Sequence, residues 1–127
     1  MILTKEIPAM ILVVDDDKVM TVLSKRFLGE AGYEVRVSHN GEEAYKELQD
    51  PKCKSMLLDI QMPGINGAEL LMLMTTEDID VPVIVMTSFA DFDAEEMKQF
   101  PHVKTFFHKP LYPEEVLAAV QKYAKKA

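Results

Sequence analysis

The sequence predicts an α/β fold in which a doubly wound, five-stranded parallel sheet carries helices on both faces. Two observations predict it. Short apolar runs alternate five times with segments of helical spacing, and several of the runs are continuously apolar, as in strands buried on both faces. Alternation at this spacing implies right-handed crossovers between parallel strands, which place helices on both sides of the sheet.

The first two strand–helix pairs end at residues that typically close such elements. The first strand runs into three aspartates, and the first helix stops at Gly32, a typical glycine just past a helix end. The second strand alternates apolar and polar residues, as a half-exposed strand does, and the second helix stops at Asp50-Pro51. The expected ranges are Met10–Val14, Lys18–Ala31, Tyr33–Ser38 and Asn40–Gln49.

Three further pairs follow. The loop of residues 61–67 joins the third pair, and Pro82 lies at the start of the fourth strand, where a missing N–H is tolerable. The fourth helix is short and polar, whereas the fifth starts at Pro113, a residue suited to a first helical turn. For five units, the flavodoxin-like order 2-1-3-4-5 is expected, with a crevice at the carboxyl ends of the first and third strands. The expected ranges are Ser55–Ile60, Ala68–Thr76, Val81–Met86, Asp91–Phe100, Lys104–His108 and Pro113–Lys125.

Length and composition limit the possible classes of protein. The chain has 127 residues, so we expect one domain, 1–127, with a core at about 10–125. Cys53 is the single cysteine, which excludes a disulfide scaffold, and we expect it to be a loop thiol without a role. The net charge of −7 argues against nucleic-acid and membrane partners. A start without a basic segment and apolar runs of at most six residues favour a cytoplasmic location.

Chemically useful side chains lie at the ends of four of the expected strands. The first strand ends in three aspartates, Asp15 to Asp17, the third in Asp59, the fourth in Thr87 and the fifth in Lys109. Clustered carboxylates repel one another unless a cation joins them, and Mg²⁺ suits oxygen ligands beside phosphate groups. A hydroxyl and an ammonium group complete what phosphoryl transfer requires, and an aspartate can itself be the nucleophile.

Four segments at these positions resemble the signature segments of response-regulator receiver domains. The resemblance extends from Met10 to Tyr123, and the Asp-x-x-Met-Pro-x-x-Asn-Gly pattern at the end of a buried strand is the most specific of the four. The segments are Ile11–Asp16, Leu58–Gly67, Val83–Thr87 and His108–Pro110.

The resemblance implies a role for each of these residues. Asp59 would accept a phosphoryl group from a sensor histidine kinase or a histidine phosphotransfer protein, and an unknown output protein would respond. Thr87 and Lys109 would contact phosphoryl oxygens, Thr87 and Phe106 would form the switch, and the bond before Pro110 would be cis. The chain would not be an enzyme beyond its own phosphorylation and dephosphorylation. The Mg²⁺ (or Mn²⁺) ligands would be Asp16, Asp59, the backbone carbonyl of Gln61 and, mainly through water, Asp15.

Three positions depart from the family's usual pattern. Ser88 stands where Ala or Gly is commoner, so access to the phosphoryl group should be narrower. Phe106 replaces the commoner Tyr and lacks its hydroxyl, and residues 100–103 replace a small Gly-Ala turn. The remaining features have ordinary structural explanations: Asp17 is an expected helix cap, Met72 and Met74 are expected core residues, and His39, His102 and His108 are expected to be solvated.

Two other functions remain open from the sequence. One is a small Mg²⁺-dependent phosphatase of the haloacid-dehalogenase type, whose nucleophile would be Asp15. Against it, no later acidic pair closes a strand and the chain has no room for a cap domain. The other is a pseudo-receiver, a binding module that is never phosphorylated. The phosphorylated residue separates the three possibilities, since it would be Asp59, Asp15 or neither.

Overall fold

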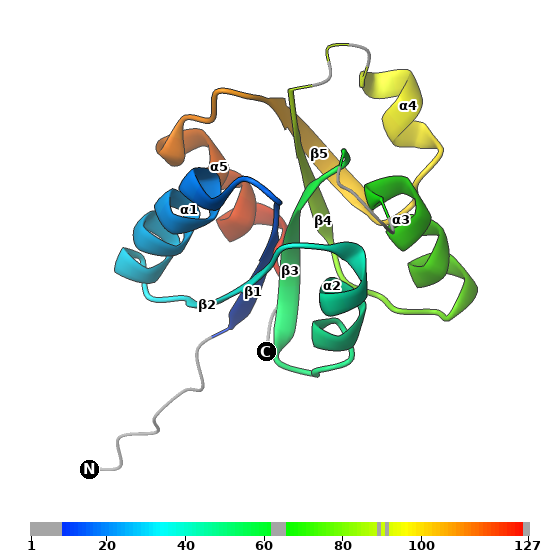
Figure 1. The fold of residues 1–127 in the computed structure, drawn as a ribbon, viewed down its shortest axis with the longest axis horizontal. Helices are drawn as coiled ribbons and strands as arrows, with labels where there is room; N and C mark the ends of the chain where they lie inside the picture. Colours follow the sequence, from blue (N-terminus) through cyan, green and yellow to red (C-terminus); the bar gives the residue numbers. More distant parts are fainter. Residues whose placement is uncertain (1–8, 62–65, 89, 91, 126–127) are drawn as a thin grey trace.

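A computed structural model describes residues 9–61, 66–88, 90 and 92–125 of the chain, and five strands alternate with five helices within them (Figure 1). The predicted alternation is therefore confirmed. The elements are β1 Met10–Val14, α1 Lys18–Glu30, β2 Glu34–Ser38, α2 Gly41–Glu47, β3 Cys53–Asp59, α3 Gly67–Thr76, β4 Val83–Thr87, α4 Ala94–Lys98, β5 Val103–His108 and α5 Pro113–Tyr123.

The strands form one parallel sheet in the order β2-β1-β3-β4-β5, as predicted. β1 is fully buried, and its residues alternate between two cores: Ile11 and Val13 belong to one, and Met10, Leu12 and Val14 to the other. This explains the continuous apolar run, because a central strand covered on both faces has no side for polar residues.

Helices cover both faces of the sheet (Figure 1). α1 and α5 lie on one face, where Leu28, Val116 and Val120 join the first core. α2, α3 and α4 lie on the other, where Leu48 and Leu70 belong to the second core. Because the strands are parallel, their carboxyl ends meet at one edge of the sheet, and that edge carries the candidate site.

Asp17 caps α1, as the sequence predicts. Its Oδ1 accepts hydrogen bonds from the backbone N–H groups of Val19 and Met20 at 2.9 and 3.4 Å. At the other end of the helix, Gly32 has a φ of +100°, a conformation that favours glycine. The two ends therefore fix where α1 begins and stops.

The fourth helix is shorter than predicted. The sequence suggests Asp91–Phe100, whereas α4 covers Ala94–Lys98; Asp91 lies outside the described residues. The side chain of Asp93 accepts a hydrogen bond from the N–H of Glu96 and thereby starts the helix at Ala94. The helix ends at Lys98 because the residue before Pro101 avoids the helical conformation.

Two predictions about single residues were wrong. Cys53 is not in a loop: it is the first residue of β3, it is buried, and burial raises the pKa of its thiol to about 12. Met72 is not a core residue, because its side chain is 63% exposed on α3, whereas Met74 is buried as expected.

In α1, several apolar residues face solvent and two polar residues face the sheet, unlike in a simple amphipathic helix. The buried face consists of Thr21, Ser24 and Leu28, while Val19, Val22 and Leu23 are 67%, 66% and 51% exposed. Small side chains on the buried face allow the helix to lie close to the sheet. Among the described helices, none combines the length and apolar character that a membrane crossing requires.

Candidate functional site

The carboxyl edge of the sheet brings together the four predicted strand-end residues. Asp15 directly follows β1, Asp59 and Thr87 are the last residues of β3 and β4, and Lys109 directly follows β5. β1, β3, β4 and β5 are consecutive in the sheet, so residues up to 94 positions apart in the sequence meet here. Thr87 is completely buried, and the N–H of Lys109 donates to its backbone carbonyl at 2.7 Å.

Three carboxylates form the centre of the site. One oxygen each of Asp15, Asp16 and Asp59 can be chosen so that all three lie within 4.8 Å of one another. Backbone N–H groups orient two of them: Asp15 Oδ1 accepts from the N–H of Asp17 at 2.9 Å, and Asp59 Oδ1 from that of Gln61 at 3.0 Å. Asp15 is fully buried and Asp59 is 6% exposed, whereas Asp16 is open to solvent.

Lys109 supplies the positive charge of the site. Its Nζ lies 2.7 Å from Asp15 Oδ2 and 3.3 Å from Asp59 Oδ2. Burial lowers the pKa of Lys109, but the hydrogen bond to Asp15 and the charges of Asp59 and Asp15 outweigh it, so the pKa is raised. The ammonium group therefore stays charged between the two carboxylates.

The pKa of Asp59 is raised to about 6. Burial is the largest cause and the negative charge of Asp15 adds to it, against the hydrogen bond from Gln61 and the charge of Lys109. One ammonium group thus does not neutralise this set of carboxylates. The donor set fits a hard divalent cation, because such an ion takes carboxylate oxygens and would remove the repulsion that raises the pKa.

We expect this carboxyl group to make the metal-free protein more stable in mild acid. Since the pKa of Asp59 is about 6 in the folded chain and ordinarily 3.8, the folded state binds the proton first. Stability should therefore rise as the pH falls through 6 toward 4, by on the order of 2 kcal/mol. The free energy of unfolding in urea, measured between pH 7.5 and 4.5, tests this expectation.

An Asp59→Asn variant isolates this contribution, because its amide does not titrate. The stability difference between the variant and the unsubstituted chain should shrink as the pH falls from 7 to 4.5, and millimolar Mg²⁺ should reduce the pH dependence of the unsubstituted chain. A constant difference over this range would show that the pKa of Asp59 is not raised.

The remaining predicted site residues lie at the margin of this cluster. Gln61 is exposed and lies two residues after Asp59, the last residue of β3. Residues 62–65 of the signature segment lie outside the described residues. The Lys109–Pro110 peptide bond is cis. Phe106 is half-buried and packs edge-to-face against Phe92, with ring centroids 5.5 Å apart.

The structure shows contacts of two further residues for which the sequence suggested no role in the site. Gly67 lies so close to β3 that a Cβ atom there would stand 2.6 Å from the Cα of Ile60 and 2.9 Å from the carbonyl oxygen of Asp59. His108 is exposed, as predicted, and its Nε2 lies 2.9 Å from the carbonyl oxygen of Phe92. The glycine in the signature segment could have indicated the close approach at Gly67, but no sequence pattern indicated the contact of His108 with Phe92.

Comparison with known proteins agrees with the fold and the acidic edge. A family model described as the response regulator receiver domain matches residues 11–121. Sporulation initiation phosphotransferase F of Bacillus subtilis is 31% identical over 113 residues, which cover 89% of this chain and 91% of that protein. The strand order, the acidic edge and these matches together define a receiver module of two-component signalling. The chain belongs to the response regulator receiver domain family.

Two further relatives show how this domain occurs elsewhere. Regulatory protein VanRB of Enterococcus faecalis is 36% identical over 90 residues, which cover 71% of this chain but 40% of that protein. The response regulator TrrA of Thermotoga maritima, solved in complex with Mg²⁺-BeF, is 31% identical with a TM-score of 0.78, covering 90% of this chain and 97% of that one. Receiver domains bind Mg²⁺ at an acidic cluster, and the cluster here is Asp15, Asp16 and Asp59.

Proposed function

We propose that this chain accepts a phosphoryl group on Asp59 from a sensor histidine kinase or a histidine phosphotransfer protein, and that phosphorylation switches its binding to an output protein. One observation carries the proposal: a nearly buried aspartate at a strand end shares the ammonium group of Lys109 with Asp15, beside the exposed carboxylate of Asp16. Residues 10–125 would form the working domain, acting in the cytoplasm and not as an enzyme on other substrates.

The chemistry assigns a task to each group. A carboxylate oxygen of Asp59 attacks the phosphorus of a phosphohistidine; the P–N bond breaks, its electron pair stays on the imidazole, and an aspartyl phosphate forms. Lys109 and the hydroxyl of Thr87 would stabilise the negative oxygens of the transferring group. Mg²⁺ (or Mn²⁺), held by Asp15, Asp16, Asp59 and the carbonyl of Gln61, would neutralise further charge on the phosphoryl oxygens. Attack by water on the phosphorus restores the carboxylate.

The geometry argues against the phosphatase alternative. Its nucleophile, Asp15, is fully buried, and both of its oxygens are engaged, one by the N–H of Asp17 and one by Lys109. Asp59 is slightly exposed, and burial together with the negative charge of Asp15 raises its pKa. A module that never takes up phosphate would have no use for the four strand-end groups assembled here.

Mapping the phosphorylated residue tests the proposal. The chain is incubated with acetyl phosphate with and without Mg²⁺, and intact mass should show one added phosphoryl group only with the metal. Borohydride reduction then converts an aspartyl phosphate to homoserine, which peptide mass spectrometry locates. Homoserine at position 59 supports the proposal, homoserine at position 15 supports the phosphatase, and no uptake supports the pseudo-receiver.

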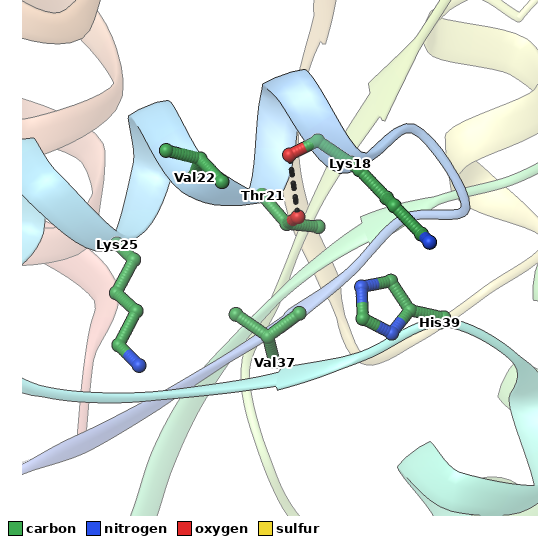
Figure 2. Close-up of a pocket in the computed structure, with 6 residues that line it drawn as sticks. All are labelled: Lys18, Thr21, Val22, Lys25, Val37 and His39. Carbon is green, nitrogen blue, oxygen red and sulfur yellow. Dashed lines mark hydrogen bonds between the residues drawn. The ribbon is translucent and has the colours of Figure 1, made fainter.

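A surface beside the site suits the docking of a phosphodonor. Val19, Val22 and Leu23 are exposed on α1, which begins at Lys18, two residues after Asp16. Next to them, an open cavity of about 310 Å³ lies between α1 and β2 (Figure 2). It is lined by Lys18, Thr21, Val22, Lys25, Val37 and His39.

The charges around this cavity indicate the character of the donor. Figure 2 shows Lys18 extending toward His39, and Lys25 extending toward β2 beside Val37. Among the described residues, Lys18 and Lys25 form no ion pair, although acidic residues outnumber basic ones by 21 to 14 in the sequence. We therefore propose that the donor presents apolar side chains flanked by carboxylates to this surface.

A charge placed on this surface should slow transfer from a protein donor only. We expect Leu23→Glu to slow phosphotransfer from the fastest sensor kinase of the source organism tenfold or more, since a buried leucine contributes about 1.5–3 kcal/mol. Labelling by acetyl phosphate should not change. Met72→Glu, on the exposed surface of α3, is the matched control and should transfer normally. Equal rates for both variants would place docking elsewhere.

A further inference from the structure

β2 lies at one end of the sheet, and its outer edge has no neighbouring strand within the described part of the chain. Toward β1, the N–H of Glu34 donates a hydrogen bond of 3.1 Å and the carbonyl of Ser38 accepts one of 3.2 Å. Successive residues of a strand direct their backbone groups to opposite edges. Val35 and Val37, which alternate with these residues, therefore direct their N–H and carbonyl groups outward.

An open cavity lies on each side of this outer edge. The cavity on the α1 side, of about 310 Å³, is the one shown in Figure 2. The cavity on the α2 side has about 330 Å³ and is lined by Val37, Ser38, His39, Glu43, Lys46 and Glu47. Val37 and His39 line both cavities, so the two border the same end of β2. Because successive side chains of a strand point to opposite faces, an added strand would direct alternate side chains into the two cavities.

The two cavities differ in charge. Two lysines and no acidic residue line the α1-side cavity, together with Val22 and Val37. Two glutamates and one lysine line the α2-side cavity, where three carboxylates share the guanidinium group of Arg36. If two copies of the chain paired their β2 strands antiparallel, a two-fold axis would bring lysines near lysines and glutamates near glutamates. Like charges in such positions are destabilising, so the charges favour a different chain as the partner.

We propose that the outer edge of β2 binds an extended segment of another protein as an additional strand. On the α1 side this segment presents apolar and acidic side chains, and on the α2 side basic ones. Hydrogen bonds to the backbone of Val35 and Val37 provide affinity, and the two cavities provide sequence preference. The inference goes beyond the proposed function and does not depend on phosphorylation. The segment and the phosphodonor would exclude each other, because both use the α1-side cavity.

A synthetic peptide tests the proposal on the full chain. The probe is Lys-Val-Lys-Val-Lys-Glu-Lys, capped at both ends, and the control peptide has the same composition in the order Lys-Lys-Val-Val-Glu-Lys-Lys. By NMR titration, we expect the alternating peptide to bind about tenfold more tightly than the control peptide. It should also slow amide hydrogen exchange at Val35 and Val37 about tenfold, because both N–H groups become hydrogen-bonded. Exchange at Glu34, which already donates toward β1, should stay the same.

A substitution on the outer edge tests the backbone contact. Val37→Pro removes an outward N–H, which an edge strand tolerates, and Val37→Ala is the matched control that also shortens the side chain but keeps the N–H. We expect Val37→Pro to bind the alternating peptide about threefold to tenfold more weakly than Val37→Ala does. The amide spectrum shows whether each variant is folded, and the exchange measurement on the unsubstituted chain decides the question if Val37→Pro is not.

Three results would overturn the inference. They are equal affinity for the two peptides, unchanged exchange at Val35 and Val37 with the alternating peptide bound, and equal binding by folded Val37→Pro and Val37→Ala. Protection of Val35 and Val37 that increases with protein concentration in the absence of peptide would show that a second copy of the chain occupies the edge instead. Failure to take up phosphate from acetyl phosphate would contradict the proposed function and leave these measurements unaffected.

Discussion

Replacing Asp59 by Asn should abolish phosphorylation by acetyl phosphate. The amide is a poor nucleophile and cannot form an acyl phosphate, while it has nearly the same size as the carboxyl group that it replaces. Asp59 is nearly buried at the end of β3, and burial together with the negative charge of Asp15 raises its pKa. Intact mass after incubation with acetyl phosphate and Mg²⁺ should show no added phosphoryl group.

The matched control for this variant is Asp17→Asn. Asp17 is two residues from Asp15, but its side chain caps α1 and lies outside the metal-compatible group. Because Asn is an equally good cap, the folded structure should be kept and labelling should remain. Continued labelling of Asp59→Asn at one site would show that another residue is the nucleophile, and loss of labelling in Asp15→Asn alone would point to the phosphatase chemistry.

Much of this site could be predicted because its residues are defined by position along the chain. A parallel sheet collects whatever follows its strands at one edge, so Asp15, Asp59, Thr87 and Lys109 could be placed together from strand ends alone. The structure adds what strand ends do not encode, such as the engagement of both Asp15 oxygens. Such contacts depend on side-chain conformations, which the sequence pattern does not specify.

The exposed face of α1 and the contact of His108 with Phe92 were not predicted, for a related reason. Apolar residues at helical spacing indicate a helix, but they do not say which face meets the sheet, and here Thr21 and Ser24 are the buried ones. His108 contacts Phe92, which is 16 residues away in the sequence. Contacts between residues at that separation leave no local periodicity. The length of α4 was missed because a side-chain cap, rather than helix propensity, sets its start.

Gly67→Ala should be the most destabilising small substitution near the site. The N–H of Gly67 donates to the carbonyl of Ile60 at 3.1 Å, which brings the start of α3 against the end of β3. An added Cβ would stand 2.6 Å from the Cα of Ile60 and 2.9 Å from the carbonyl oxygen of Asp59. Both are backbone atoms, so relief requires moving the strand end or the helix. We expect a loss of about 3 kcal/mol in the free energy of unfolding, measured with urea.

The same substitution should also impair the chemistry, because the displaced backbone is that of the proposed phospho-acceptor. Uptake of phosphate from acetyl phosphate should slow in the folded variant, measured at a temperature well below its melting point. Gly29→Ala is the matched control: a Cβ at Gly29, inside α1, would meet no atom within 4 Å. Alanine there should raise stability by up to about 1 kcal/mol through its helix propensity. If Gly67→Ala proved as stable as Gly29→Ala, the close approach of α3 to the Asp59 strand end would be refuted.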